Sequence, residues 1–362
     1  MRSRCFSPGL LLVVALAAGA QQSNPADSAA SQNPATAAGQ ATSREIQLVV
    51  MVNDKAGHAI SGLERGDFTL LDNNHPTQID SFNGFIPSTP ESQPQQQIIL
   101  IMDGVNIAYQ EVSYARLGID KFLRSGGRLP APMSIYWYTD EGLREEEGPA
   151  TDGNALADQL DAAQARLRML TSAAGTWGAI ERFDMSVQTL DKLVRMYRAK
   201  PGRKLLIWLG RGWPMLQDPS LQMTWKDQQR LFANIVELNT VIRQAHVSIY
   251  SVTPGVPERY PYQYEEFVKG VKNPSHAFLP NLDLKVLAEQ SGGVVVNPSN
   301  DLGSQIEQCM QDTKAYYVIG FTPPQSGERD EYHELKVRVD KPGLTARTNT
   351  GYYNEPVGIP TR

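Results

Sequence analysis

Cysteine and histidine are scarce in this chain, which has two cysteines and five histidines among 362 residues. One cysteine is Cys5, so the chain beyond the first residues keeps only Cys309 and cannot form an internal disulfide. The histidines occur singly, and the sequence contains no His-Glu-x-x-His, Gly-x-Ser-x-Gly, Cys-x-x-Cys or phosphate-loop motif. These absences argue against the common hydrolase, redox and nucleotide-binding classes. We therefore expect a protein that is not an enzyme.

An excess of positive charge is also missing. The chain has 34 Lys and Arg against 39 Asp and Glu, a formal net charge of −5. Nucleic acids and anionic membranes attract proteins with basic surfaces. The sequence thus predicts neither kind of partner.

A third absence is an apolar run long enough to span a bilayer. The run Leu10–Ala18 follows Arg2 and Arg4 and precedes Ala18-Gly19-Ala20, which is the pattern of a signal peptide. We expect residues 1–20 to be removed and the mature protein to be secreted or periplasmic, with no transmembrane segment. An uncleaved anchor is the alternative.

What the chain does contain is β-type patterning at both ends. After residues 21–43, a polar stretch expected to be a disordered spacer, residues 44–90 read as short strands and turns. Residues 330–354 read likewise: Tyr332–Val339 alternates apolar and polar side chains, and Leu344–Asn349 is expected to pair with it. Because each segment has too few strands alone, we expect them to form one small β-sandwich-like domain. Two independent hairpins are the alternative.

Between these ends, residues 97–325 alternate strand and helix patterns. Ile98–Met102 and Lys204–Leu209 are apolar runs typical of strands buried on both faces, and helical periodicity such as that of Ile180–Tyr197 separates such runs. Tyr316–Phe321 is expected to be the last strand. The pattern predicts an α/β fold with a mostly parallel, doubly wound sheet.

Asp103 directly follows the first buried strand of this region. In an open α/β sheet, ligands bind beyond the carboxyl ends of the strands. Asp103 is therefore the first candidate binding residue, the alternative being a solvated aspartate in a turn.

The order of three features resembles a von Willebrand factor type A domain: a buried strand ending in Asp103, Gly175-Thr176 before a long helix, and the apolar strand Leu205–Leu209. The whole mature chain resembles, more narrowly, the secreted type A-related proteins of acidobacteria. The segments that carry this second resemblance are Ser61-Gly62-Leu63, Asp67-Phe68, Ser291-Gly292-Gly293, Tyr316–Phe321 and Gly351-Tyr352-Tyr353.

The resemblance implies a cation site, from which this sequence departs. Type A domains commonly bind a divalent cation through Asp-x-Ser-x-Ser, a threonine and a later aspartate. Here Val105 and Ile107 stand where the serines belong, and Arg211 stands where the later aspartate belongs. An alternative alignment puts Leu209-Gly210 at that last position, which also lacks a carboxylate.

The resemblance therefore implies a degenerate crevice made by Asp103, Asn106, Thr176 and Arg211. We expect Arg211 to bind Asp103 through charge-assisted hydrogen bonds, with no cofactor. Should Mg²⁺ or Mn²⁺ bind after all, its ligands would be Asp103, Thr176 and Asp140.

A possible partner surface lies in the tyrosine-rich insertion after the strand that ends at Val252. It contains Tyr260, Tyr262 and Tyr264, to which Trp213 and Trp225 could be neighbours. A loop packed on its own domain is the alternative. The sequence thus favours an exported, non-catalytic module that binds a protein or a surface polymer. A metal-dependent adhesion module is the close alternative, and an enzyme without a recognisable motif is the distant one.

Overall fold

The computed structural model describes residues 45–86, 96–107, 109–164, 175–214, 216, 223–255, 263–324 and 328–355. The expected signal peptide and spacer lie outside these ranges. Within them, no helix is long and apolar enough to cross a membrane.

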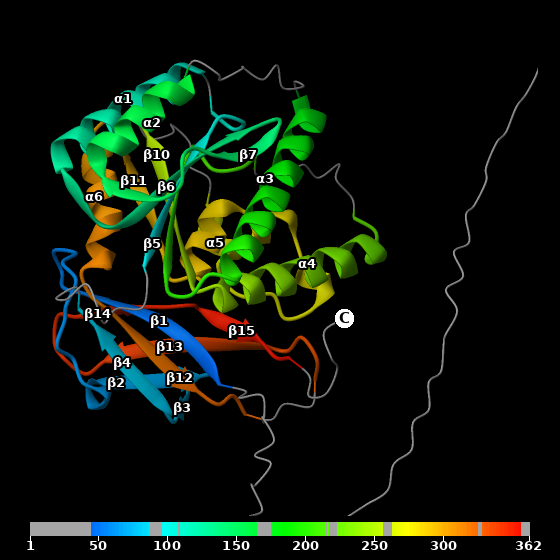
Figure 1. Ribbon diagram of the computed structural model, residues 1–362. Helices are drawn as coiled ribbons and strands as arrows, with labels where there is room; N and C mark the ends of the chain where they lie inside the picture. Colours follow the sequence, from blue (N-terminus) through cyan, green and yellow to red (C-terminus); the bar gives the residue numbers. More distant parts are fainter. Residues whose placement is uncertain are drawn as a thin grey trace, which may run out of the picture. The chain divides into compact units, whose positions relative to one another are not determined.

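A seven-stranded sheet forms the centre of the described chain (Figure 1). Its strands, in spatial order, are β11 (Val294–Ser299), β10 (Val247–Pro254), β9 (Lys204–Leu209), β5 (Gln97–Asp103), β6 (Arg128–Thr139) and β7 (Gly142–Glu145), with β8 (Ala150–Asp152) also paired to β6. The first five run parallel, whereas β7 and β8 are antiparallel to β6. The expected mostly parallel sheet is confirmed.

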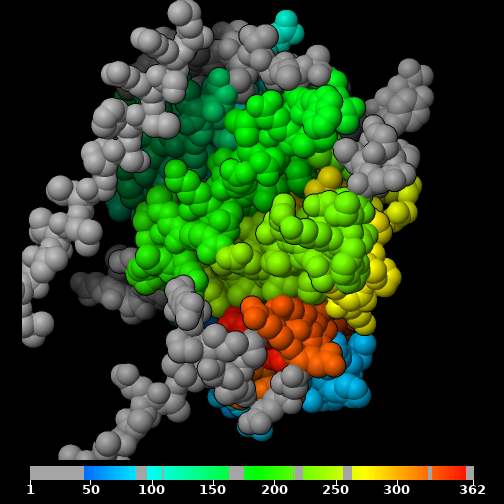
Figure 2. Space-filling model, turned by 90° about the vertical axis from the view of Figure 1, so that its right-hand side faces the viewer, coloured from blue at the N-terminus to red at the C-terminus, as the bar shows by residue number. Residues whose placement is uncertain are grey.

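Helices cover both faces of this sheet. They are α1 (Tyr109–Gly126), α2 (Gly153–Gln164), α3 (Gly175–Arg198), α4 (Trp225–Gln244), α5 (Leu284–Gln290) and α6 (Leu302–Met310). Alternate side chains of β5 point to opposite faces: Ile99 and Ile101 belong to the apolar cluster with α3, α4 and α5, and Ile98 and Leu100 to the cluster with α1, α2 and α6. Figure 1 and Figure 2 show α3 and α4 side by side on the first of these faces. The strong apolar character of β5 follows from this burial on both sides.

Among the described residues, five short 3₁₀ helices connect the main elements. They are η1 (Arg65–Asp67), η2 (Tyr264–Phe267), η3 (Pro274–His276), η4 (Leu279–Leu282) and η5 (Gln311–Thr313).

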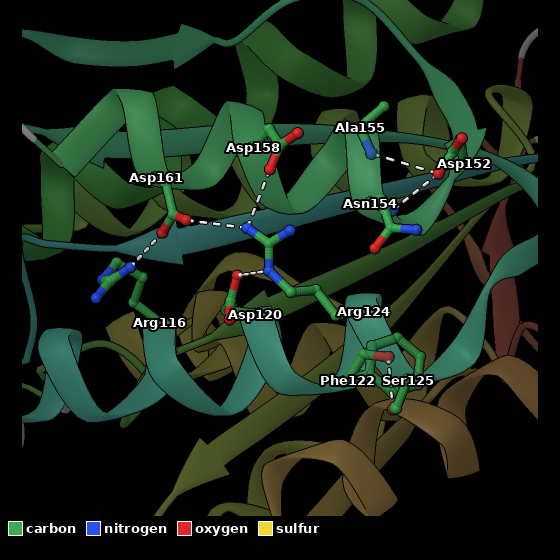
Figure 3. A network of polar contacts seen from close by, with 10 residues as sticks. All are labelled: Arg116, Asp120, Phe122, Arg124, Ser125, Asp152, Asn154, Ala155, Asp158 and Asp161. Atoms are coloured by element: carbon green, nitrogen blue, oxygen red, sulfur yellow. Dashed lines mark hydrogen bonds and ion pairs between the residues drawn. The ribbon is translucent and has the colours of Figure 1, made fainter.

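A surface network of ion pairs joins α1 to α2 (Figure 3). Arg116 binds Asp161 at 2.6 Å, and Arg124 bridges Asp158 and Asp161 at 3.0 Å each. Asp152 accepts hydrogen bonds from the backbone amides of Asn154 and Ala155 in the first turn of α2. Exposed ion pairs contribute about 0–1 kcal/mol each, so this network fixes the orientation of the two helices more than it stabilises them.

Strands from both ends of the chain build two four-stranded sheets. One has the order β14 (Thr345–Arg347), β1 (Ile46–Asn53), β12 (Tyr316–Phe321), β4 (Ser81–Phe85), and the other β15 (Gly351–Tyr353), β13 (Tyr332–Val339), β2 (Phe68–Asp72), β3 (His75–Thr77). Side chains of both sheets, Leu48, Ile319, Leu70 and Leu335 among them, meet in a single apolar cluster. N-terminal and C-terminal strands therefore share one core.

Two expected strand pairings are wrong. Tyr316–Phe321 does not join the α/β sheet but lies antiparallel to β1, with Ile319 opposite Leu48. The segment Leu344–Asn349 does not pair with Tyr332–Val339, because β2 and β15 take the two edges of that strand. Its residues form β14 instead, beside β1. An apolar strand pattern reports burial but does not identify the neighbouring strand.

Candidate functional site at the carboxyl edge of the sheet

The carboxyl ends of β5, β6, β9 and β10 meet at one edge of the central sheet. Asp103 is the last residue of β5 and lies opposite Tyr138 of β6. The amide of Gly104 donates to the Tyr138 carbonyl (2.8 Å), and the amide of Gly210 donates to the Val252 carbonyl (3.0 Å). These bonds hold the loops that follow the strands close to Asp103.

The Asp103 carboxylate is completely enclosed and already saturated with hydrogen bonds. Its side chain belongs to a residue with 0% exposure. Oδ1 accepts from the backbone amides of Val105 and Asn106 at 2.9 Å each, and Oδ2 accepts from Asn106 Nδ2 at 2.8 Å and Trp208 Nε1 at 2.9 Å. A carboxylate offers about four acceptor positions. Four protein donors therefore leave little room for another ligand.

Local sequence explains much of this arrangement. An aspartate that accepts bonds from backbone amides two and three residues later stabilises a tight turn, and the strand ends there. Gly210 faces the same carboxylate across the edge, where an added Cβ would lie 2.9 Å from Asp103 Cβ. Only glycine fits at that position without movement.

Burial raises the pKa of Asp103 above its ordinary value, and hydrogen bonds from Asn106, Trp208 and the backbone partly offset this rise. All four donors are neutral groups. The buried carboxylate is thus stabilised by the dipoles of neutral N–H groups and not by a positive charge.

A polar chain continues from this carboxylate into the interior. Asn106 Nδ2 also donates to Ser186 Oγ (3.0 Å), which in turn donates to the Arg182 carbonyl (2.7 Å) and lies 3.2 Å from the Tyr138 hydroxyl. Asn106 Oδ1 is buried without a hydrogen-bond partner among the described residues. Asp103 and Asn106, predicted to share the crevice, do lie together.

The expected pair between Arg211 and Asp103 is not formed. Arg211 Nε lies 3.0 Å from each carboxylate oxygen of Glu111 in the first turn of α1, and its Nη2 also contacts Glu111. The Asp103 oxygens point inward and are occupied, whereas the Arg211 side chain remains 42% exposed. A guanidinium keeps its hydration more easily with a partner at the surface.

The remaining crevice residue, Thr176, and the alternative metal ligand, Asp140, are not bonded to the carboxylate. Thr176 is exposed in the first turn of α3, and Asp140 is exposed in the turn between β6 and β7. No hydrogen bond within the described chain joins either of them to Asp103.

The partner surface expected around Trp213 needs correction. Trp213 is only 4% exposed and packs edge-on against Trp208 and Phe183, at ring-centroid distances of 5.4 and 6.4 Å. It is a core residue. Tyr260 and Tyr262 lie outside the described residues.

Tyr264 is half-buried in η2 and donates its hydroxyl hydrogen to Glu289 of α5 at 3.4 Å. Burial raises its pKa. This contact favours the alternative in which the insertion packs on its own domain.

Two other tryptophans are exposed to solvent: Trp225, which was expected near the tyrosine-rich insertion, and Trp177, which the sequence did not single out. Trp177 is 82% exposed and Trp225 is 57% exposed. Trp177 begins α3, whose Ser186 contacts Asn106 beside Asp103, so the N-terminal end of α3 lies on the carboxyl side of the sheet. Trp225 begins α4, which packs along β15 through the contact of Phe232 with Tyr353. Their position outside the buried stripe of each helix was the available sequence signal.

The residues at this edge do not fit the cation site that a type A domain would imply. Mg²⁺ requires about six oxygen ligands at roughly 2.1 Å. Val105 and Ile107 are apolar and buried, and the Asp103 oxygens are occupied by protein donors. Within the described ranges, no three His, Cys, Asp or Glu side chains are grouped so as to hold a metal ion.

Comparison with known proteins gives no family assignment, because no family model and no curated protein matches the chain. Among solved structures, the human COPII-coat protein Sec24c aligns with a TM-score of 0.34 and 10% identity, over 75% of this chain and 46% of its own. An aerotolerance-related membrane protein from Bacteroides fragilis, carrying multiple mutations to serines, aligns with a TM-score of 0.35 and 10% identity, over 61% of this chain and 100% of its own. Similarity this low carries no functional argument.

Proposed function

We propose that this protein is an exported, non-catalytic binding module of the type A kind. It engages a protein or a cell-surface polymer at the carboxyl edge of the central sheet, without a metal ion. The observation that carries the proposal is the 82% exposure of Trp177 at that edge, and Trp225 at the start of α4 is also exposed, at 57%.

Exposed tryptophans of this kind are unusual on a surface that contacts only water. Burying one such side chain on binding is worth about 1.5–3 kcal/mol. Tryptophan and arginine are also the residues most enriched among energetically dominant contacts. Arg211, whose side chain is 42% exposed, adds a guanidinium at the same edge.

The metal-free part of the proposal rests on Asp103. A cation would have to displace protein donors from a carboxylate that is 0% exposed and accepts four hydrogen bonds. The same enclosure keeps Asp103 from acting on a substrate as a general acid or base, since such a group must reach the reacting atom. This supports the non-catalytic assignment, as does the lack of catalytic motifs in the sequence.

A capture experiment tests the binding edge. The mature protein is immobilised and exposed to the envelope fraction of the exporting cell, and the recovered partner is quantified. We expect the double variant Trp177→Ser, Trp225→Ser to recover at least about ten-fold less partner, because two anchors worth about 2 kcal/mol each are lost.

The matched control is Leu117→Ser, which removes an apolar side chain that is 58% exposed on α1. It should recover as much partner as the wild type, and chelation of divalent cations should change nothing. If the tryptophan variant recovered as much partner as the wild type, the proposed binding surface would be wrong. Loss of binding on chelation would instead favour metal-dependent adhesion.

Export is tested separately by the mass of the mature protein. Removal of residues 1–20 leaves an N-terminus at Gln21, or its cyclised form. Recovery of the intact Met1–Ala20 segment would contradict the localisation.

A further inference from the structure

The strand β7 is an edge of the central sheet. Within the described residues it pairs only with β6. The amide of Glu146, just after β7, donates to the Ile135 carbonyl at 3.1 Å. In an antiparallel pair alternate residues face the partner strand, so the amides and carbonyls of Leu143 and Glu145 point away from β6. Such outward groups are a template for a further strand.

A groove of about 790 Å³ lies beside this edge, between the β6–β7 hairpin, α3 and α4. Its volume is within the range of about 300–1,000 Å³ that is usual for binding sites. Leu143, Met185 and Met196 contribute apolar surface to its wall, and Met196 is 44% exposed. Figure 2 shows the face of the molecule on which α3 and α4 lie.

The groove is predominantly acidic. Its charged lining residues are the carboxylates Asp140, Glu141, Glu145, Asp191 and Glu237 and the cations Lys192 and Arg195. Arg195 already binds Asp191 at 2.8 Å and Glu237 at 2.7 Å. Of the lining charges outside this ion-pair network, three are the hairpin carboxylates and one is Lys192, so the hairpin side of the groove keeps an excess of negative charge.

We propose that β7 accepts an extended segment of a partner protein as an additional strand, and that this segment carries lysine or arginine at alternating positions. Side chains of a strand alternate between its faces. Those on the same face as Leu143 and Glu145 would lie over the groove and meet its carboxylates. In strand addition, main-chain hydrogen bonds give affinity and the alternate side chains give specificity.

This surface is independent of the tryptophan edge proposed above. It uses main-chain groups of β7 and the hairpin carboxylates, and neither Trp177 nor Trp225 lines the groove. The double tryptophan variant should therefore bind the segment as the wild type does, so the two proposals can fail separately.

The test titrates a short, fluorescently labelled peptide of alternating lysine and valine into the full mature protein at low salt. We expect saturable binding, slower hydrogen exchange at the amides of Leu143 and Glu145, and weaker binding at high salt. The same peptide with N-methyl groups on the residues that bond to β7 should bind at least about ten-fold more weakly, as should a glutamate–valine peptide.

The double variant Glu141→Lys, Glu145→Lys should weaken binding of the lysine peptide at least about ten-fold while its melting temperature stays near that of the wild type. The control Glu307→Lys reverses an exposed charge on α6, on the opposite face of the sheet, and should bind normally. Should the peptide fail to bind the wild type, or the N-methylated peptide or the double variant bind as tightly, strand addition at β7 is wrong.

Discussion

Two buried aspartates, Asp103 at the carboxyl edge and Asp312 after α6, have the same chemistry and almost the same exposure, 0% and 2%. Asp103 is bound only by neutral donors. Asp312 Oδ2 lies 2.6 Å from Arg347 Nη2 and accepts from the Tyr250 hydroxyl at 2.5 Å, while Oδ1 accepts from Asn53 Nδ2 at 3.3 Å.

As a result, the pKa values of the two aspartates shift in opposite directions. Burial raises the pKa of Asp103, and its hydrogen bonds offset that only in part. Burial would also raise the pKa of Asp312, but the positive charges of Arg347 and Arg203 outweigh it, with help from the Tyr250 hydrogen bond, and hold the pKa below its usual value. Burial alone therefore does not predict how a carboxylate titrates; its partners decide.

The two carboxylates also differ in what they connect. Asp103 is held mostly by its own turn, whereas Asp312 joins β1, β10 and β14 through Asn53, Tyr250 and Arg347. Arg347 further donates to Asn53 Oδ1 (3.0 Å) and to the Gly292 carbonyl (3.1 Å). The network around Asp312 thus ties the central sheet to the terminal sheet that contains β1 and β14. Its charges have a structural role that does not require a ligand.

Removing Arg347, the positively charged partner of Asp312, should have the largest effect on stability. Arg347→Met leaves the carboxylate of Asp312 buried without its closest cation, which should lower the free energy of unfolding by about 3–5 kcal/mol. Urea denaturation measures this. Arg338→Met, an exposed change on β13, should cost less than about 0.5 kcal/mol. A loss below about 1 kcal/mol for Arg347→Met would mean that Arg203 and Tyr250 suffice.

Neutralising Asp103 should lower the free energy of unfolding by a smaller amount. In Asp103→Asn only one of the two side-chain positions keeps an acceptor oxygen, so either the Val105 and Asn106 backbone amides or Asn106 Nδ2 and Trp208 Nε1 lose their acceptor, at about 1–3 kcal/mol in total. Urea denaturation again reports the change. Asp140→Asn, an exposed substitution, is the control. If Asp103→Asn were as stable as the wild type, the carboxylate would not be the acceptor that organises the turn.

The pH dependence of stability should differ in sign between the sites. Asp103, whose folded pKa is raised, binds its proton more tightly in the folded state, so its contribution to stability grows as pH falls toward the unfolded value of 3.8. Asp312, whose folded pKa is lowered, contributes stability above 3.8 that is lost as pH falls through its folded pKa.

Urea denaturation between neutral pH and mild acid measures the first effect. Asp103→Asn should lose stability more steeply on acidification than the wild type does. Parallel profiles for the two proteins would show that the pKa of Asp103 is unshifted.

The smallest expected effect is that of divalent cations. Millimolar Mg²⁺ or Mn²⁺ should leave the melting temperature unchanged, because a ligand stabilises only the state that it binds. Arg211→Asp should not create cation dependence, since Arg211 is paired with Glu111 and not with Asp103. An Mg²⁺-dependent rise in the wild type that disappears in Asp103→Ala would reverse the metal-free proposal.

Much of the central sheet could be predicted from the sequence. The apolar run before Asp103 and the helical periodicity of Ile180–Tyr197 are local patterns, and a local pattern determines which face of an element is buried. The turn at Asp103 is equally local, since its side chain binds amides two and three residues later. For these elements the neighbours along the chain supplied the decisive interactions.

Partner choice was decided only by the tertiary structure. Tyr316–Phe321 has the same apolar pattern whether it joins the central sheet or lies beside β1, and Arg211 carries the same charge whether it meets Asp103 or Glu111. Trp213 is enclosed by Trp208 and Phe183, while Trp177 remains in solvent. Residue type sets what each side chain can bind, but the groups that reach it come from distant parts of the chain, and their positions depend on the packing of the whole core.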